Sequence, residues 1–161
     1  MSKTKNFIFK GKQSFSSSKL DQIKVQFCKS NELDTKLFSN EIYLVLAESD
    51  QINQDELKDI LSAKENDTDF SFYVGPRLGT ISPWSSKTED IIRNVGFKNI
   101  LRVERLYGFK IESDFEIDKL DLSMLYDRMT QSIYFNYEDF ADLFKTEKAK
   151  SLNKINILDK G

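Results

Sequence analysis

Apolar and polar residues alternate along residues 99–111, and this period of two constrains the fold more than any other feature of the sequence. Successive side chains of a β-strand point to opposite faces, so Val103, Tyr107 and Phe109 are expected on one face of a sheet. A second strand is predicted at residues 41–47, where EIYLVLA is a continuous apolar run of strand length. The chain is therefore expected to fold around a sheet.

Amphipathic segments separate the predicted strands. Three helices are expected to begin at the capping residues Ser18, Asn53 and Ser86. A fourth helix is expected over residues 120–133, where apolar residues recur with helical spacing. Shorter strands are predicted at residues 7–9 and 70–74, and Gly108 allows a bulge in the strand over residues 99–111. Helices of this length beside short strands predict an α+β fold with helices packed outside the sheet.

The length of 161 residues fits one domain or two small ones. We expect residues 1–145 to fold, with an internal duplication into similar strand and helix halves at about 1–80 and 81–145. No sequence repeat accompanies this duplication. Residues 146–161 lose amphipathic order and are interpreted as the start of a linker.

The chain contains no histidine and one cysteine. Without histidine it cannot form Ser-His-Asp or Cys-His triads, histidine general bases or most zinc sites. Cys28 has no partner for an intramolecular disulfide, which favours a reducing, cytoplasmic location. We interpret Cys28 as a small buried apolar residue.

The charge balance gives no electrostatic reason to expect nucleic acid or a membrane as partner. Lys and Arg number 24 and Asp and Glu 26, a net charge of −2. No window approaches 18 consecutive apolar residues, so no spanning helix is predicted. The basic N-terminal segment lacks the apolar stretch of a secretory signal.

The composition changes sharply between Gly75 and Lys87. The segment GPRLGTISPWSSK holds both prolines and the only tryptophan. A loop of about a dozen residues without periodicity is uncommon in a compact domain, and such loops are often functional. Ser86 and Glu89 have the spacing of a capping box, so a helix is predicted to begin where the loop ends.

This loop is a candidate anion-binding site or docking surface. Free amides and the positive end of a helix attract a phosphate or carboxylate. The candidate residues combine small hydroxyls, one indole and two cations: Arg77, Thr80, Ser82, Trp84, Ser85, Ser86 and Lys87. The alternative is a capped helix after an ordered loop, with Trp84 as a partly buried anchor. A P-loop is excluded, because Ser86 stands where that motif needs glycine.

The remaining charged residues predict no catalytic constellation and no metal site. Arg102, Glu104 and Arg105 are expected to form a charge network on the surface of the predicted strand. Asp114, Glu116, Asp118 and Asp121 lack the glycine and terminal glutamate of a calcium loop.

The segment VGPRLGTISPWSSKTEDIIRNVGFKNILRVERLYGFKI resembles a region near the N-terminus of the large, single-chain phosphoribosylformylglycinamidine synthase family. The hallmark run of that family is matched by Pro76, Arg77, Gly79, Thr80, Ile81, Ser82, Pro83, Trp84, Ser85, Ser86 and Lys87. The resemblance is strong over residues 74–145. Later matches include Asp127-Arg128-Met129 and the aromatic, acidic stretch at residues 135–144.

The resemblance implies an N-terminal, non-catalytic domain of a purine-biosynthetic ligase. The family enzyme is a glutamine amidotransferase that converts formylglycinamide ribonucleotide to its amidine with ATP. Its N-terminal domain is similar to a dimer of the small structural subunit of the multi-chain enzyme, and it scaffolds the synthetase and glutaminase domains. Those domains are the implied partners. ATP and Mg²⁺ belong to the parent enzyme, and no cofactor is expected in this chain.

Two other functions stay open from the residues themselves. The chain could be a free-standing module that holds a small anion with the loop at residues 75–87, or a standalone assembly subunit. By the leading interpretation the chain alone is inactive. If the loop contacts other domains, Arg77, Trp84 and Lys87 are expected to be exposed.

Overall fold

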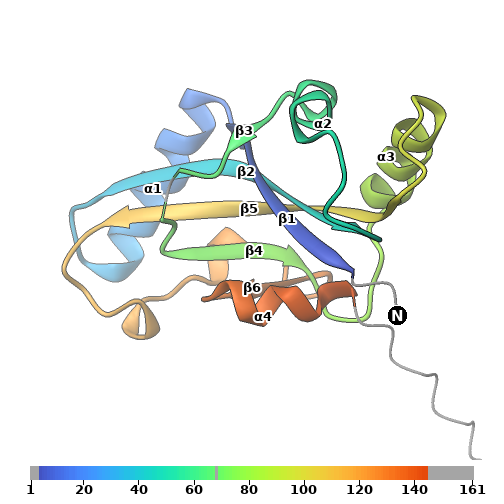
Figure 1. Cartoon of the computed structure of the whole chain (residues 1–161). Helices are drawn as coiled ribbons and strands as arrows, with labels where there is room; N and C mark the ends of the chain where they lie inside the picture. Colours follow the sequence, from blue (N-terminus) through green and yellow to red (C-terminus); the bar gives the residue numbers. More distant parts are fainter. Residues whose placement is uncertain (1–3, 68, 145–161) are drawn as a thin grey trace, which may run out of the picture.

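The predicted strand over residues 99–111 is confirmed and lies at the centre of a six-stranded sheet (Figure 1). The computed structural model describes residues 4–67 and 69–144. β5 (Ile100–Glu112) pairs antiparallel with β2 (Lys36–Ala47), from Lys36 opposite Glu112 to Ala47 opposite Ile100. The sheet order is β3-β1-β2-β5-β4-β6, with every described pairing antiparallel. The other strands are β1 (Lys5–Gln13), β3 (Lys64–Glu65), β4 (Phe72–Pro76) and β6 (Gln131–Tyr134).

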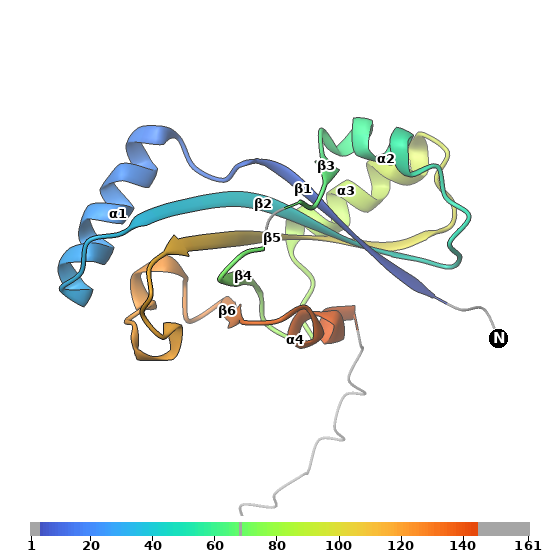
Figure 2. The same ribbon diagram turned by 60° about the vertical axis from the view of Figure 1, so that its left-hand side comes forward.

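Helices lie on both faces of this sheet, so the predicted α+β class with helices outside the sheet is confirmed (Figure 2). The first face carries α1 (Ser17–Asn31), α2 (Gln54–Leu61) and α3 (Pro83–Asn94), and the second carries α4 (Tyr137–Ala141). The 3₁₀ turn η3 (Asp142–Phe144) follows α4.

Three apolar clusters join these helices to the sheet. On the first face, Phe27 of α1 packs with strand residues at one end, and Leu57 of α2 and Ile92 of α3 pack at the other. On the second face, Leu106 of β5 packs with Leu143 of η3. Burial of each large side chain contributes about 1.5–3 kcal/mol, so all three clusters stabilise the same sheet.

The helix predicted over residues 120–133 is wrong. The chain forms two 3₁₀ turns, η1 (Ile117–Lys119) and η2 (Ser123–Leu125), and then β6. Aspartate side chains accept backbone N–H groups two residues ahead: Asp121 from Ser123 at 3.0 Å and Asp127 from Met129 at 2.8 Å. Such local bonds compete with a helical backbone and favour turns.

Two predicted N-caps on the first face have different outcomes. Asn53 caps α2, because its side chain accepts the N–H of Glu56 at 3.2 Å. Ser18 is not the cap of α1: Ser16 takes that role, accepting from Lys19 at 3.3 Å. Several serines in succession satisfy the same local rule, so the sequence places the start of α1 only to within a turn.

Gly108 allows a bulge or a bend by its sequence, and the β2–β5 pairing has no bulge there. The β2–β5 register runs unbroken past Gly108, which lies opposite Asn40, and its irregularity lies at Leu46 and Ala47. A Cβ added to Gly108 would lie 2.8 Å from the ring of Phe70. Glycine therefore lets this aromatic ring pack directly on the strand backbone.

Two strand–helix–strand units meet at the centre of the sheet. β1, α1 and β2 form one unit, and β4, α3 and β5 form the other, joined by the β2–β5 pairing. The predicted division at residue 80 falls between β4 and α3, inside the second unit. The similarity of the two halves stays a prediction, and the linker predicted at residues 146–161 lies outside the described residues.

Candidate functional site

The loop of interest lies where β4 separates from β5. β4 pairs with β5 only as far as Val74, opposite Tyr107, whereas Gly75 and Pro76 pair with β6. The loop then spans residues 77–82, shorter than predicted, because β4 extends to Pro76 and α3 begins at Pro83. It connects the end of β4 to the start of α3.

The start of α3 lies four residues before the predicted one. Ser82 is the N-cap and accepts the N–H of Ser85 at 3.1 Å, and Pro83 follows in the first turn. Proline favours this position, because its fixed φ suits a helix and the missing N–H would have no helical partner there. The capping box predicted for Ser86 is therefore wrong. Its expected partner, Glu89, accepts instead from the Ser85 hydroxyl at 3.1 Å.

A carboxylate of the chain itself occupies the N-terminus of α3. Glu104 of β5 is fully buried and accepts from the Ser82 hydroxyl at 2.5 Å and the Ser82 N–H at 3.4 Å. The N–H of Arg105 donates at 3.1 Å, and the Arg102 guanidinium lies 3.5 Å away. The predicted surface charge network is thus wrong, since its acid is a buried internal anion. A phosphate does not fit at this helix end, which Glu104 already fills.

Arg102 connects the loop to the C-terminal part of the described chain. Its guanidinium donates to the carbonyl oxygen of Thr80 at 2.7 Å and to that of Leu143 at 3.1 Å. It also lies 5.0 Å from the ring centre of Phe144. The Arg102 side chain, 13% exposed, therefore holds the loop, β5 and η3 together.

A second ion pair lies on the first face of the sheet, where the neighbouring residue Arg105 points. Its guanidinium is 3.6 Å from the Glu41 carboxylate, 5.1 Å from the Trp84 ring centre and 5.5 Å from that of Tyr107. Trp84 stacks on Tyr43 at 5.7 Å, and the Tyr43 hydroxyl donates to Glu41 at 2.6 Å. Burial, and then this bond, raise the pKa of Tyr43 well above its usual value.

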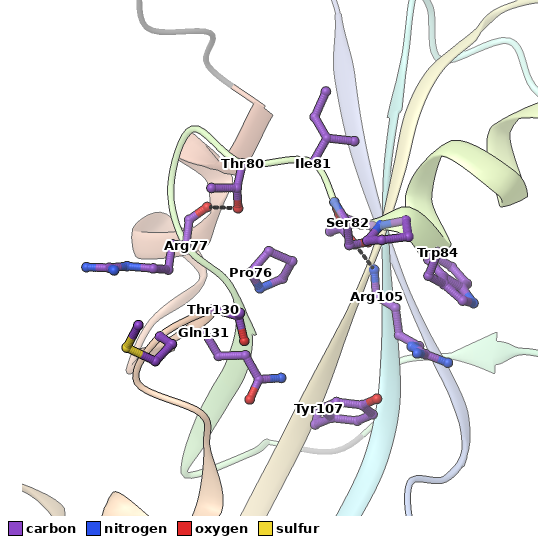
Figure 3. Close-up of a pocket in the computed structure, with 13 residues that line it drawn as sticks. Pro76, Arg77, Thr80, Ile81, Ser82, Trp84, Arg105, Tyr107, Thr130 and Gln131 are labelled. Carbon is purple, nitrogen blue, oxygen red and sulfur yellow. Dashed lines mark hydrogen bonds between the residues drawn. The ribbon is translucent and has the colours of Figure 1, made fainter.

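Trp84, Arg105 and Tyr107 border a cleft of about 650 Å³ (Figure 3). Its walls come from the end of β4, the loop, the start of α3, β5, the turn at residues 129–130 and the first residue of β6. Thr130 and Gln131 lie on one side, and Trp84 and Arg105 on the other. The volume is typical of ligand pockets.

The structure places four of the seven predicted site residues on this cleft: Arg77, Thr80, Ser82 and Trp84. Ser85 is buried beneath it and donates to the Val103 carbonyl at 2.5 Å. Ser86 and Lys87 are exposed on α3 and do not line the cleft.

Of the three residues expected to be exposed, Arg77 and Lys87 are exposed and Trp84 is half-buried. The Arg77 side chain points away from the cleft (Figure 3). Sequence reasoning missed Arg105, Tyr107 and Gln131 as lining residues. The alternation along β5 places Glu104 and Arg105 on opposite faces of the sheet. This signal could have identified Arg105 as a residue separate from the Glu104 network and available to line the cleft.

In residues 4–67 and 69–144 no three His, Cys, Asp or Glu side chains group as metal ligands do. None of the described helices is long and apolar enough to cross a membrane.

The loop and the cleft lie within a segment that matches a known protein family. The model of the family described as "Formylglycinamide ribonucleotide amidotransferase N-terminal" matches residues 39–144, from within β2 through η3. The match covers more than half of the chain and includes the whole loop and every residue that lines the cleft. The chain therefore belongs to this family, the N-terminal domain of the phosphoribosylformylglycinamidine synthase of purine biosynthesis.

Proposed function

We propose that the domain is a non-catalytic scaffold that docks the synthetase and glutaminase domains of a single-chain phosphoribosylformylglycinamidine synthase. The parent enzyme is then a cytoplasmic ligase that uses ATP and glutamine to convert formylglycinamide ribonucleotide to formylglycinamidine ribonucleotide. ATP and Mg²⁺ bind in its other domains, and this chain alone is inactive.

One observation carries the proposal: the loop bonds two of its polar groups to buried or nearly buried charged residues and leaves two apolar side chains exposed. The Ser82 hydroxyl and the Thr80 carbonyl are bonded to Glu104 and Arg102. Leu78 and Ile81, in contrast, are 54% and 60% exposed. Exposed apolar side chains that gather at one place are typical of protein interaction sites.

A third exposed apolar side chain lies on another wall of the cleft. Met129, in the turn before β6, is 82% exposed and lines the same cleft as Ile81. Methionine is common at binding surfaces because its flexible thioether adapts to a partner. We call Leu78, Ile81 and Met129 the rim cluster.

The loop beneath the rim cluster is held in place before any partner arrives. Arg102 bonds the Thr80 carbonyl, and the Arg77 N–H donates to the Thr130 carbonyl at 3.4 Å. Ser82 is fixed at both its N–H and its hydroxyl. A preorganised loop loses little conformational entropy on docking, which favours association.

The acids around the cleft support a scaffold over a catalyst. Glu104 accepts from Ser82, and Glu41 accepts from Tyr43, so each carboxylate is engaged within the domain. A general acid or base must instead reach a proton of the substrate. The alternative of a free anion-binding module relied on the N-terminus of α3, which Glu104 fills.

The experiment changes the rim cluster in the full-length enzyme. Ile81→Lys replaces an apolar side chain with a charge at the predicted interface. Burial of an isoleucine is worth about 1.5–3 kcal/mol, so docking should weaken by roughly ten- to a hundredfold. Glutamine-dependent synthesis should fall more than ammonia-dependent synthesis, because only the former needs the glutaminase in place.

Val25→Lys is the matched control. Val25 is 66% exposed, close to the value for Ile81, and lies on α1 at the other end of the first face (Figure 2). This variant should keep both activities. If Ile81→Lys also keeps the ratio of the two activities, the loop does not dock the glutaminase and the proposal fails.

A further inference from the structure

Arg105 is a cation of the cleft wall whose guanidinium donates no hydrogen bond to residues 4–67 or 69–144. Its ion-pair distance to Glu41 is 3.6 Å, longer than a hydrogen bond. The contacts of its guanidinium within the described residues are this ion pair and two aromatic rings. The side chain remains 30% exposed and lines the cleft.

Two aromatic rings fix the position of this guanidinium. It lies 5.1 Å from the ring centre of Trp84 and 5.5 Å from that of Tyr107, both within the range of a cation–π contact. Trp84 is itself stacked on Tyr43. The guanidinium therefore presents its planar fork of N–H donors from a fixed position.

The two carboxylates near the Arg105 guanidinium accept hydrogen bonds from other groups. Glu104 accepts from the Ser82 hydroxyl and lies beside Arg102. Glu41 accepts the short bond from Tyr43. Among the described residues neither acid accepts a hydrogen bond from the Arg105 guanidinium, and Glu104 is reached only by the Arg105 backbone N–H, so the guanidinium can bind a further anion.

We infer that the cleft is a carboxylate-binding site in which Arg105 receives an acidic side chain of a neighbouring domain. An Arg fork matches a carboxylate geometrically, and the apolar Ile81 and Met129 can pack against the aliphatic stem that carries it. The carboxylate site itself is independent of the proposed function. Its occupant, a protein side chain, rests on that function.

The first experiment uses the 161-residue chain and a small probe. N-acetyl-L-glutamate amide carries one side-chain carboxylate, and N-acetyl-L-glutamine amide is its uncharged match. Trp84 is the only tryptophan, so its indole N–H resonance reports on the guanidinium beside it. The titration is followed by ¹⁵N NMR at constant pH and ionic strength.

The glutamate probe should give a saturable shift of the Trp84 resonance, with a dissociation constant on the order of 1 mM. The glutamine probe should bind at least about tenfold more weakly, because it lacks the charge. Arg105→Lys should weaken binding severalfold, since lysine keeps the charge beside Glu41 but lacks the planar fork. Lys87→Gln, which removes an exposed cation of α3 outside the cleft, should not change binding.

A shift that does not saturate, equal binding of both probes, or unchanged binding by Arg105→Lys would overturn the inference. In the full-length enzyme, Arg105→Lys should lower glutamine-dependent synthesis about fivefold or more, whereas Lys87→Gln should not. If the chain binds the probe but the full-length Arg105→Lys and Ile81→Lys enzymes are normal, the carboxylate site stands and docking fails. If Ile81→Lys alone is impaired and no probe binds, docking stands and the inference fails.

Discussion

Glu104 is the residue whose loss should damage the domain most specifically. Every polar contact of its carboxylate is with a donor: the hydroxyl and N–H of Ser82, the N–H of Arg105 and the guanidinium of Arg102. Glu104→Gln keeps the shape of the side chain. It replaces one acceptor oxygen with an amide NH₂ that faces these donors, and it removes the charge that pairs with Arg102.

The size of the effect follows from burial. Glu104 is 0% exposed, and the Arg102 side chain is 13% exposed, so water cannot replace the lost contacts. Breaking a buried ion pair by removing one partner costs about 3–5 kcal/mol. One remaining acceptor oxygen offsets part of this, so we expect a loss of about 2–4 kcal/mol. For a chain of this length, the melting temperature should fall by roughly 5–15 °C.

Urea unfolding followed by circular dichroism measures this loss. The matched control is Glu116→Gln, because Glu116 is paired with Lys119 but its side chain is 64% exposed. An exposed pair of this kind is worth about 0–1 kcal/mol, so the control should stay close to the parent chain. If Glu104→Gln is as stable as Glu116→Gln, the buried carboxylate does not organise the start of α3.

Three further outcomes are expected from the fold. Ser82→Ala should cost about 1 kcal/mol in urea unfolding, because it removes the α3 cap, whereas Ser86→Ala should cost much less. Burial raises the pKa of Tyr43, so the folded state keeps a phenol proton that the unfolded state loses above the usual value of 10.0. Melting temperature should therefore fall as pH rises above 10.0, and Tyr43→Phe should show a shallower fall. Gly108→Ala should destabilise the chain by about 1–3 kcal/mol, because its Cβ meets Phe70, and Phe70→Leu should relieve part of this loss.

The elements that the sequence predicts best are long strands whose apolar and polar residues follow the two faces of the sheet. β2 and β5 were predicted because apolar runs and alternation depend only on neighbours along the strand. The boundaries within the serine-rich segments were not, because Ser82 and Ser86 both satisfy the local capping rule. Pro83 and the distant Glu104 decide between them.

For the site, too, residues close together in the sequence could be predicted, whereas residues brought together only by the fold could not. The unusual composition of the loop identified Arg77, Thr80, Ser82 and Trp84, which line the cleft. The opposite wall, at residues 129–131, belongs to the segment predicted as a helix, so it could not be assigned to a cleft. Asp127 bonds the backbone N–H of Met129 and favours a turn, after which the segment pairs with β4. The apolar periodicity of the segment does not show that such side-chain bonds compete with a helix.

The central claim is that the loop at residues 77–82 docks on another part of the parent enzyme. Hydrogen exchange of this loop, measured in the 161-residue chain and in the full-length enzyme under identical conditions, tests it most directly. We expect loop amides to exchange at least about tenfold more slowly in the full-length enzyme, because docking removes them from solvent. Equal exchange of the loop in the two proteins would contradict the account.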